Sequence, residues 1–186
     1  PIYYNVTSIA VQADGKILVG GDFQLANGQP RKNLVRLNSD GSVDATFNSN
    51  VGGGLPDVQS IAVQTDGKIM IGGNFSTVDG ITRNRLARLQ PNGSLDPSFD
   101  RGSNFSTVLS ITILSDGKIL ASGSGQPSGL WRYNSDGTRD MTFTVADTGR
   151  SDTKGYLQAD GKIMVTAGFY TVDGQPRVNV ARLNAN

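Results

Sequence analysis

The chain contains neither cysteine nor histidine. The lack of cysteine excludes disulfide bonds, thiol nucleophiles and thiolate metal sites. The lack of histidine removes the commonest general base and metal ligand, and it excludes every catalytic triad that uses histidine. No apolar run approaches the roughly 20 residues that a helix needs to cross a bilayer. These absences favour a non-catalytic protein that does not insert into a membrane.

A surplus of charge of one sign is also missing. The 186 residues include 17 Lys and Arg against 16 Asp and Glu, which gives a net charge of +1. The charges are interspersed, whereas nucleic-acid binding needs a basic stripe or face. We therefore expect no nucleic-acid partner. Aromatic residues make up only 7% of the chain and glycine contributes 24 residues, as expected for β-structure with many turns.

What the chain does have is an internal repeat. The tripeptide Asp-Gly-Lys occurs four times, beginning at Asp14, Asp66, Asp116 and Asp160, in steps of 52, 50 and 44 residues. A period of this size in a strand-rich chain is typical of propeller blades or a related β-array. We predict a single propeller-like domain or propeller segment over residues 1–186, with repeats at about 6–50, 58–102, 108–146 and 152–186.

Each repeat is predicted to form four short strands. In the second repeat these cover residues 60–64, 68–71 and 86–89 and a short segment that ends at Phe99. β-Branched residues and leucine fill the runs, and Asp-Gly or Asn-Gly pairs separate them. No stretch keeps helical spacing, so we expect almost no helix. Both faces of the strands carry apolar residues, as in blades packed face to face. The predicted fold is an all-β propeller of four four-stranded antiparallel blades.

Two turns recur in the repeats. The first, with Asp66-Gly67 in the second repeat, fits a two-residue hairpin or a three-residue turn with glycine in the left-handed region, and both stay open. The second, Gln90-Pro91-Asn92-Gly93, favours the three-residue form because proline suits position i+1 of a type I turn.

The fourth repeat lacks the segment that closes the other three. In a closed ring, residues 1–4 would supply the missing strand as a strap between the termini. In the alternative, the four repeats are consecutive blades of a larger ring. The sequence leaves both arrangements open.

The repeat as a whole reads V-x-S-I-A-V-Q-x-D-G-K-I-x-x-G-G-x-F, followed by R-L-N-x-D-G-S-x-D-x-x-F. This pattern resembles the delta-60 repeat family, over nearly the whole chain and most closely in the first two repeats. The resemblance implies a β-propeller-like architecture and a place in bacterial secreted or surface proteins. That family carries no assigned activity, so the resemblance transfers no functional residue.

Charged residues recur in register. Arginine takes one position of the third strand, and aspartate takes one position across the following turn: Arg36, Arg88, Arg132 and Arg182, with Asp44, Asp96 and Asp140. In a short hairpin these residues are direct or diagonal neighbours, which predicts an ion pair in each blade. A ring of charges around a channel is the alternative.

The segment from Asp40 to Asp44 superficially resembles a calcium loop. Calcium prefers roughly six to eight oxygen ligands, usually with several carboxylates in one loop. Turn chemistry explains the same residues. We therefore expect no metal site and no cofactor, with Ca²⁺ as the alternative.

The candidate binding residues lie mainly in the long connection between strands two and three, which a propeller places on one rim. Loops on a rigid scaffold commonly carry binding sites, although these arginines could also tie each loop to its own blade. Trp131 takes the strand position of Val35, Ala87 and Ala181, where it could fill space or stack on a sugar. The predicted set is Asn27, Gln29, Arg31, Asp79, Arg83, Trp131, Asp173, Gln175 and Arg177.

The function favoured by these observations is a non-catalytic binding or structural repeat module of a bacterial extracellular, cell-surface or appendage protein, including a phage fibre. It would mediate assembly or adhesion, with a protein or a surface glycan as partner and with homo-oligomers as one form of assembly. The alternative is a lectin-like propeller that binds carbohydrate through the rim loops and Trp131. A glycosidase-like enzyme with paired carboxylates comes third. Only Asp147 and Asp152 break the repeat in the way that a catalytic pair would.

Overall fold

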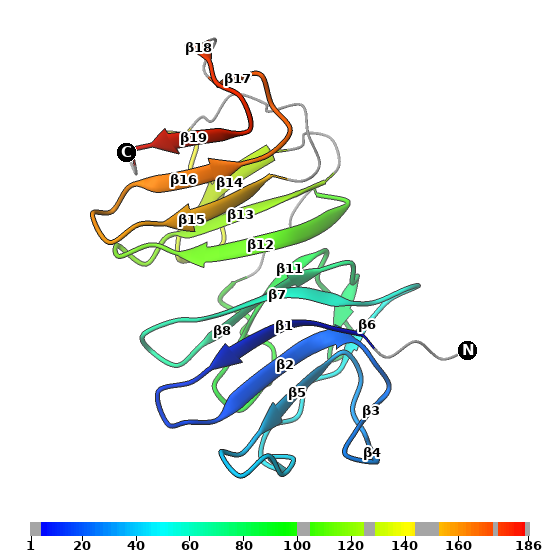
Figure 1. Ribbon diagram of the computed structural model, residues 1–186. Helices are drawn as coiled ribbons and strands as arrows, with labels where there is room; N and C mark the ends of the chain where they lie inside the picture. Colours follow the sequence, from blue (N-terminus) through cyan, green and yellow to red (C-terminus); the bar gives the residue numbers. More distant parts are fainter. Residues whose placement is uncertain (1–4, 100–104, 125–128, 144–152, 173–174, 185–186) are drawn as a thin grey trace.

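The computed structural model describes residues 5–99, 105–124, 129–143, 153–172 and 175–184. Every regular element in these ranges is a β-strand (Figure 1). The expected all-β fold is confirmed. In the same ranges no helix is long and apolar enough to cross a membrane.

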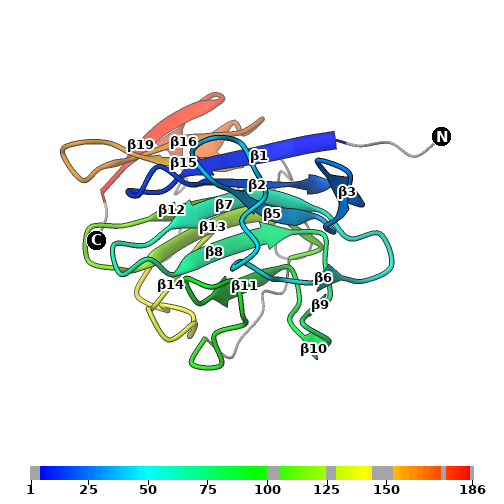
Figure 2. The same cartoon turned by 90° about the horizontal axis from the view of Figure 1, so that it is seen from below.

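Four three-stranded antiparallel sheets follow one another along the chain, one for each repeat, and we call them blades 1 to 4. Blade 1 contains β1 (Asn5–Val11), β2 (Ile17–Asp22) and β5 (Leu34–Leu37), and blade 2 contains β7 (Val58–Val63), β8 (Ile69–Gly73) and β11 (Leu86–Leu89). Blade 3 contains β12 (Thr107–Ile113), β13 (Ile119–Ser124) and β14 (Gly129–Tyr133), and blade 4 contains β15 (Lys154–Leu157), β16 (Ile163–Thr166) and β19 (Val180–Leu183). The second strand of each blade lies in the middle of its sheet. Figure 1 shows the blades stacked in chain order, and in the view from below in Figure 2 they overlap one another.

The predicted fourth strand is only partly present. In blades 1 to 3 the chain makes one isolated bridge to the third strand, at Leu37–Val43, Leu89–Leu95 and Tyr133–Arg139. In blade 1 the chain then turns away, because Asp44 Oδ1 accepts a hydrogen bond from the Thr46 backbone N–H at 2.9 Å. A local side-chain bond of this kind competes with the ladder of a sheet. The prediction of four full strands per blade is corrected to three strands per blade, with one further bridge in each of blades 1 to 3.

Short hairpins connect the second and third strands of blades 1, 2 and 4. They consist of β3 (Leu25–Ala26) with β4 (Gln29–Pro30), β9 (Thr77–Val78) with β10 (Ile81–Thr82), and β17 (Thr171–Val172) with β18 (Gln175–Pro176). The second hairpin gains a third strand, β6 (Val51–Gly52), from the segment between blades 1 and 2.

The recurring Asp-Gly-Lys turn takes the three-residue form. In blade 2 the Gln64 N–H donates to the Lys68 carbonyl at 2.8 Å, and the Gly67 N–H donates to the Gln64 carbonyl at 3.0 Å. Gly67 has a φ of +82°, the left-handed region that glycine enters without a Cβ clash. The second turn, from Gln90 to Ser94, shows the same pair of bonds, as its proline predicted.

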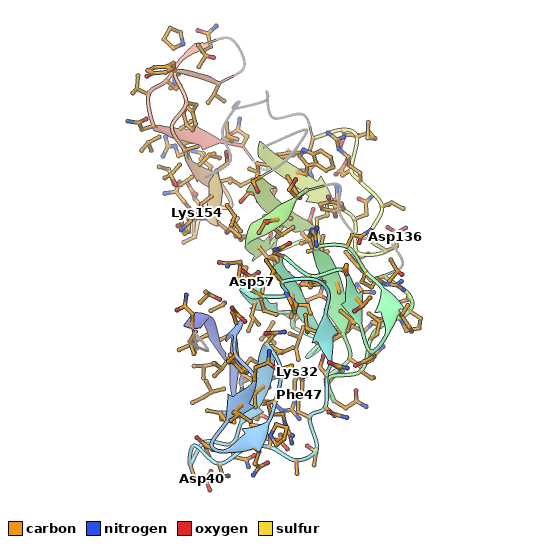
Figure 3. The ribbon with its side chains drawn as sticks, turned by 90° about the vertical axis from the view of Figure 1, so that its right-hand side faces the viewer. Lys32, Asp40, Phe47, Asp57, Asp136 and Lys154 are labelled. Carbon is orange, nitrogen blue, oxygen red and sulfur yellow. The ribbon has the colours of Figure 1, made fainter. Side chains whose placement is uncertain are left out.

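The apolar core lies between neighbouring blades. One cluster joins blades 1 and 2, a second joins blades 2 and 3, and a third joins blades 3 and 4. Phe47, Phe75, Phe99 and Phe169 are fully buried in these layers. Figure 3 shows Phe47 among the side chains beside blade 1, with Asp40 on a turn at the end of the molecule. The prediction that both sheet faces are covered is therefore confirmed for blades 2 and 3.

Candidate functional site

The recurring arginine and aspartate do form an ion pair in each of blades 1 to 3, and a lysine joins them. In blade 1, Asp44 Oδ2 accepts hydrogen bonds from Arg36 Nε and from Lys16 Nζ, both at 2.8 Å. The other carboxylate oxygen, Oδ1, accepts from the backbone N–H and the hydroxyl of Thr46. We call this arrangement a brace. Its equivalents are Lys68, Arg88 and Asp96 in blade 2 and Lys118, Arg132 and Asp140 in blade 3.

The braces change the proton affinity of their carboxylates. Burial acts to raise the pKa of Asp44 and of Asp96, but hydrogen bonds from lysine, Thr46 or Ser98, and arginine outweigh it. The net result is a pKa well below the ordinary aspartate range. The pKa of Asp140 is lowered as well, most strongly by Lys118. These carboxylates are therefore ionised hydrogen-bond acceptors at neutral pH, the opposite of what a general acid requires.

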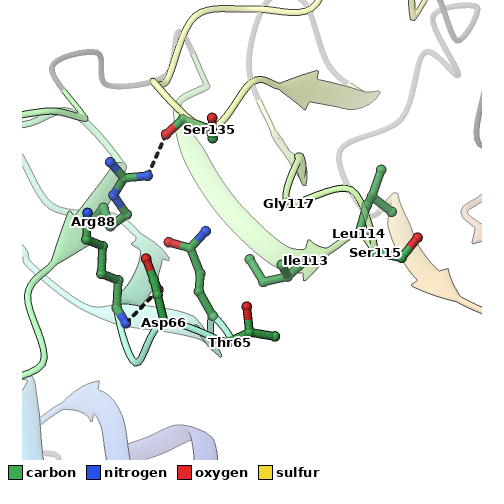
Figure 4. A pocket seen from close by; sticks show the side chains of 10 residues that line it. Thr65, Asp66, Arg88, Ile113, Leu114, Ser115, Gly117 and Ser135 are labelled. Atoms are coloured by element: carbon green, nitrogen blue, oxygen red, sulfur yellow. Dashed lines mark hydrogen bonds between the residues drawn. The ribbon is translucent and has the colours of Figure 1, made fainter.

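The brace arginines of blades 1 and 2 also reach the next blade. Arg36 donates to the Pro91 carbonyl at 2.6 Å, and Arg88 donates to the Ser135 carbonyl (Figure 4). The acceptors occupy equivalent turns of blades 2 and 3. The Arg36 guanidinium carbon lies 4.7 Å from the centre of the Phe47 ring, within the range of a cation–π contact. Structural contacts thus account for the recurring arginines and aspartates of blades 1 to 3, as the ion-pair interpretation predicted.

Two shallow clefts open beside these contacts, at the first two of the three junctions between blades. The cleft between blades 1 and 2 has a volume of about 520 Å³, and the one between blades 2 and 3 has about 420 Å³. Their walls are the two neighbouring Asp-Gly-Lys turns, with Arg36 or Arg88 at one side (Figure 4). Because the clefts repeat with the blades, they are consequences of the stacking geometry.

The predicted rim residues lie on the short hairpins, where turn geometry uses several of them. Asn27 and Asp79 have φ values of 47° and 51° and precede glycine, as in a type I′ turn. Asn27 Nδ2 donates to the Gly41 carbonyl at 2.9 Å. Asp79 Oδ1 and Oδ2 accept from the backbone N–H groups of Asn50 and Leu95. Asp79 therefore ties its hairpin to the segments before and after the blade.

The remaining described rim residues differ in hydrogen bonding and exposure. Arg31, Arg83 and Arg177 each donate from Nη1 to the carbonyl of the preceding residue, at 2.7 to 2.8 Å. Gln29 and Gln175 are exposed on β4 and β18. Asp173, like Asp147 and Asp152, lies outside the described residues. The structure thus places the described rim residues on separate hairpins of blades 1, 2 and 4, and does not bring them together into one pocket.

Trp131 lies inside the protein rather than on the rim. Only 7% of its surface is exposed, and its ring centre lies 4.9 Å from that of Phe105. The Arg139 guanidinium carbon lies 4.0 Å from the centre of the ring. The tryptophan fills the core between blades 2 and 3, together with Tyr133. A glycan would have to use other residues of the rim, such as Gln29 and Gln175.

The acidic turn considered for calcium has its carboxylates engaged. Asp40 Oδ1 accepts from both the N–H and the hydroxyl of Ser42, at 2.9 and 2.7 Å. Among the described residues, no three acidic side chains converge in a way that could hold a metal ion. The expected absence of a metal site stays a prediction, with calcium as its alternative, and a calcium-binding measurement would test it.

The open face of blade 1 is the feature that the sequence reasoning missed. Val6, Ile9 and Val11 of β1 are 52%, 63% and 68% exposed. Their counterparts in blade 2 include Val58 and Ile61, which are 0% and 9% exposed. The repeat alignment held the signal, because the same aliphatic residues recur at positions that the preceding blade covers elsewhere. A row of exposed aliphatic side chains marks an interaction surface.

Comparisons with known proteins agree with this architecture. The chain matches the family described as "Domain of unknown function (DUF5122) beta-propeller" at residues 12–47, 64–99, 114–143 and 158–186. No curated protein matches it.

Two solved structures are similar to this chain. One is a protein of unknown function from Bacteroides caccae, with 13% sequence identity and a TM-score of 0.50. The match covers 97% of this chain, which spans 61% of that protein's length. The other is a virginiamycin B lyase from Staphylococcus aureus, with 13% sequence identity and a TM-score of 0.40. That match covers 96% of this chain and 69% of the lyase chain. The first likeness concerns the fold alone, and the second is too distant to inform on activity.

The family match covers most of the chain in four separate segments. Each segment begins at an Asp-Gly-Lys turn and covers the second and third strands of one blade. The expected repeat-propeller family is confirmed at this level, although the matching description is not that of the delta-60 repeats. The chain belongs to the DUF5122 β-propeller family.

Proposed function

We propose that this chain is a non-catalytic repeat module that mediates protein–protein assembly. The observation that carries the proposal is the aliphatic row of Val6, Ile9 and Val11 on the open face of blade 1. The equivalent rows of blades 2 and 3 are part of apolar interfaces. Leaving such a surface in water is unfavourable by roughly 25 cal/mol for each Å² of apolar area. A partner that covers this face gains that free energy on binding.

The polar residues support a structural rather than a catalytic role. The recurring aspartates hold lysine, arginine and threonine or serine groups of their own blades. A catalytic carboxylate pair needs one group with a raised pKa, whereas the brace aspartates have lowered values. The described carboxylates thus suit bracing better than proton transfer.

A location outside the bacterial cell is part of the proposal. It rests on the resemblance to delta-60 repeats, which occur in bacterial secreted and surface proteins. The absence of cysteine is compatible with such a setting. On this basis the module would belong to a surface protein or an appendage, where propeller blades serve assembly or adhesion.

The test is the mass of the native full-length protein in its own source, measured by light scattering and checked by intact mass spectrometry. The proposal predicts a complex heavier than one chain. Ile9→Lys should reduce that mass to a single chain without lowering the melting temperature, because Ile9 is 63% exposed in the isolated chain. A wild-type protein that remains a single chain in its native setting would contradict the assembly role.

A further inference from the structure

Two contacts between blades inside the molecule have an aliphatic row on one side. The exposed row on blade 1 has the same register as these two buried rows. Val6 pairs with Gly21 and Ile9 with Val19 within blade 1, and Val58 and Ile61 take the same register in blade 2. Val108 and Ile111 do so in blade 3. The rows of blades 2 and 3 are buried against the preceding blade. Their contacts therefore indicate which surface would fit against the exposed row of blade 1.

The preceding blade meets this row with a glycine and a serine. A Cβ on Gly20 would lie 2.7 Å from Val58 Cγ1 and 2.9 Å from Ile61 Cδ1, so no larger residue fits there without movement. Gly72 stands in the same relation to Val108 and Ile111. Beside each glycine, a serine hydroxyl accepts the isoleucine N–H at 3.0 Å, Ser8 from Ile61 and Ser60 from Ile111.

The junction between blades 3 and 4 shows that side-chain size is balanced across the contact. There the glycine position of blade 3 is occupied by Ser122, which is fully buried. The isoleucine position of blade 4 is occupied by Gly155. A Cβ on Gly155 would come within 3.0 Å of Leu130 Cδ1. A larger residue on one side thus goes with a smaller one on the other, as close packing requires.

The open face of blade 4 does not fit the open face of blade 1 by this rule. Register places Thr166 at the position of Gly20 and Lys154 at the position of Ser8. The branched side chain of Thr166 would meet Ile9 where the internal contacts leave no room for a Cβ. Lys154 supplies a cation where the first two junctions supply a hydroxyl acceptor.

We propose that the open face of blade 1 binds a further blade of the same repeat type, supplied from outside these four blades. That blade carries glycine and serine at the positions of Gly20 and Ser8. Blade 4 of a second copy is not this partner. The inference rests on the proposed assembly function and names the chemistry of its partner.

The experiment converts blade 4 into the missing partner. The probe is this chain with Lys154→Ser, Thr166→Gly and Ile9→Lys, the last change blocking the probe's own blade 1 face. The matched control carries Ile9→Lys alone and so keeps the native blade 4. Each is mixed with wild-type chain and followed by sedimentation velocity. We expect a complex of two chains with the probe, no complex with the control, and no complex between the probe and an Ile9→Lys receptor.

Circular dichroism melting confirms that the probe is folded, and Thr166→Gly with Ile9→Lys serves as a milder probe that should bind more weakly. Binding of the control as strongly as the probe would overturn the inference and make a second copy the partner. A folded probe that does not bind would also overturn it. If the folded probe does not bind but the native protein still forms complexes heavier than one chain, the assembly function is supported and the blade-type partner is refuted. Probe binding with a native protein that stays a single chain would refute the assembly function instead.

Discussion

Replacing Gly72 with alanine tests the packing rule on which the blade contacts depend. The added Cβ would lie 2.4 Å from Val108 Cγ1 and 2.9 Å from Ile111 Cδ1, whereas ordinary contacts lie at 3.4–4 Å. Val108 is β-branched and stiff at χ1, so it cannot rotate away easily. Overpacking of this kind costs about 1–3 kcal/mol, and the loss of glycine flexibility returns about 0.5–1.

We therefore expect the free energy of unfolding to fall by about 1–2 kcal/mol, which corresponds to about 2–8 °C in melting temperature for a chain of this size. Urea unfolding and thermal melting measure both quantities. Gly54→Ala is the matched control, because no atom lies within 4 Å of its added Cβ. That variant should change stability by less than about 0.5 kcal/mol.

A double variant identifies the cause. Val108→Ala removes the methyl group that the new Cβ strikes, so the loss in Gly72→Ala/Val108→Ala should be smaller than the sum of the two single losses. A coupling of about 0.5–3 kcal/mol is usual for residues in contact. Strict additivity, or a Gly72→Ala variant as stable as the wild type, would refute the packing argument.

Three further predictions concern charge and exposure. Asp96→Ala leaves Arg88 buried without its carboxylate and should lower the unfolding free energy by about 3 kcal/mol, measured by urea titration; a loss below about 1 kcal/mol would show that the braces are dispensable. Because the folded-state pKa of each brace aspartate is depressed, stability is complete above the ordinary aspartate value of about 3.9 and declines as pH falls below it. The urea midpoint should accordingly hold from pH 7 to pH 5 and drop steadily below pH 4, and a flat midpoint down to pH 2 would contradict the assignment. Ile61→Lys should unfold the protein or cost more than about 4 kcal/mol, while Ile9→Lys should leave the melting temperature unchanged; similar effects at the two positions would contradict the burial difference.

The sequence predicts the repeats, the strands, the three-residue second turn and the arginine–aspartate pairs because each depends on local spacing. It does not reveal the lysine of each brace, since Lys16 lies 28 positions before Asp44 and meets it only after the hairpins form. Nor does it show that Arg36 reaches the Pro91 carbonyl, a contact between blades. The fourth strand was over-predicted because a local hydrogen bond from Thr46 to Asp44 turns the chain after one bridge.

The candidate site shows the same division between local and long-range information. The rim loops are where the repeat predicts them, but their residues lie apart on separate hairpins. Trp131 could not be placed from the sequence, because the same strand position holds alanine or valine in the other blades. Its burial follows from Phe105, which precedes the third repeat, and from Arg139, which lies on the turn after the same strand.

The most direct test of the central claim is whether the open face of blade 1 is covered in the native full-length protein. Because the chain has no cysteine, single variants Ile9→Cys and Leu55→Cys report on one thiol each. Both positions are exposed in the isolated chain, at 63% and 84%. We predict that a maleimide labels Leu55→Cys rapidly in the native protein and Ile9→Cys at least tenfold more slowly. Equal labelling rates at the two positions would mean that no partner covers this face.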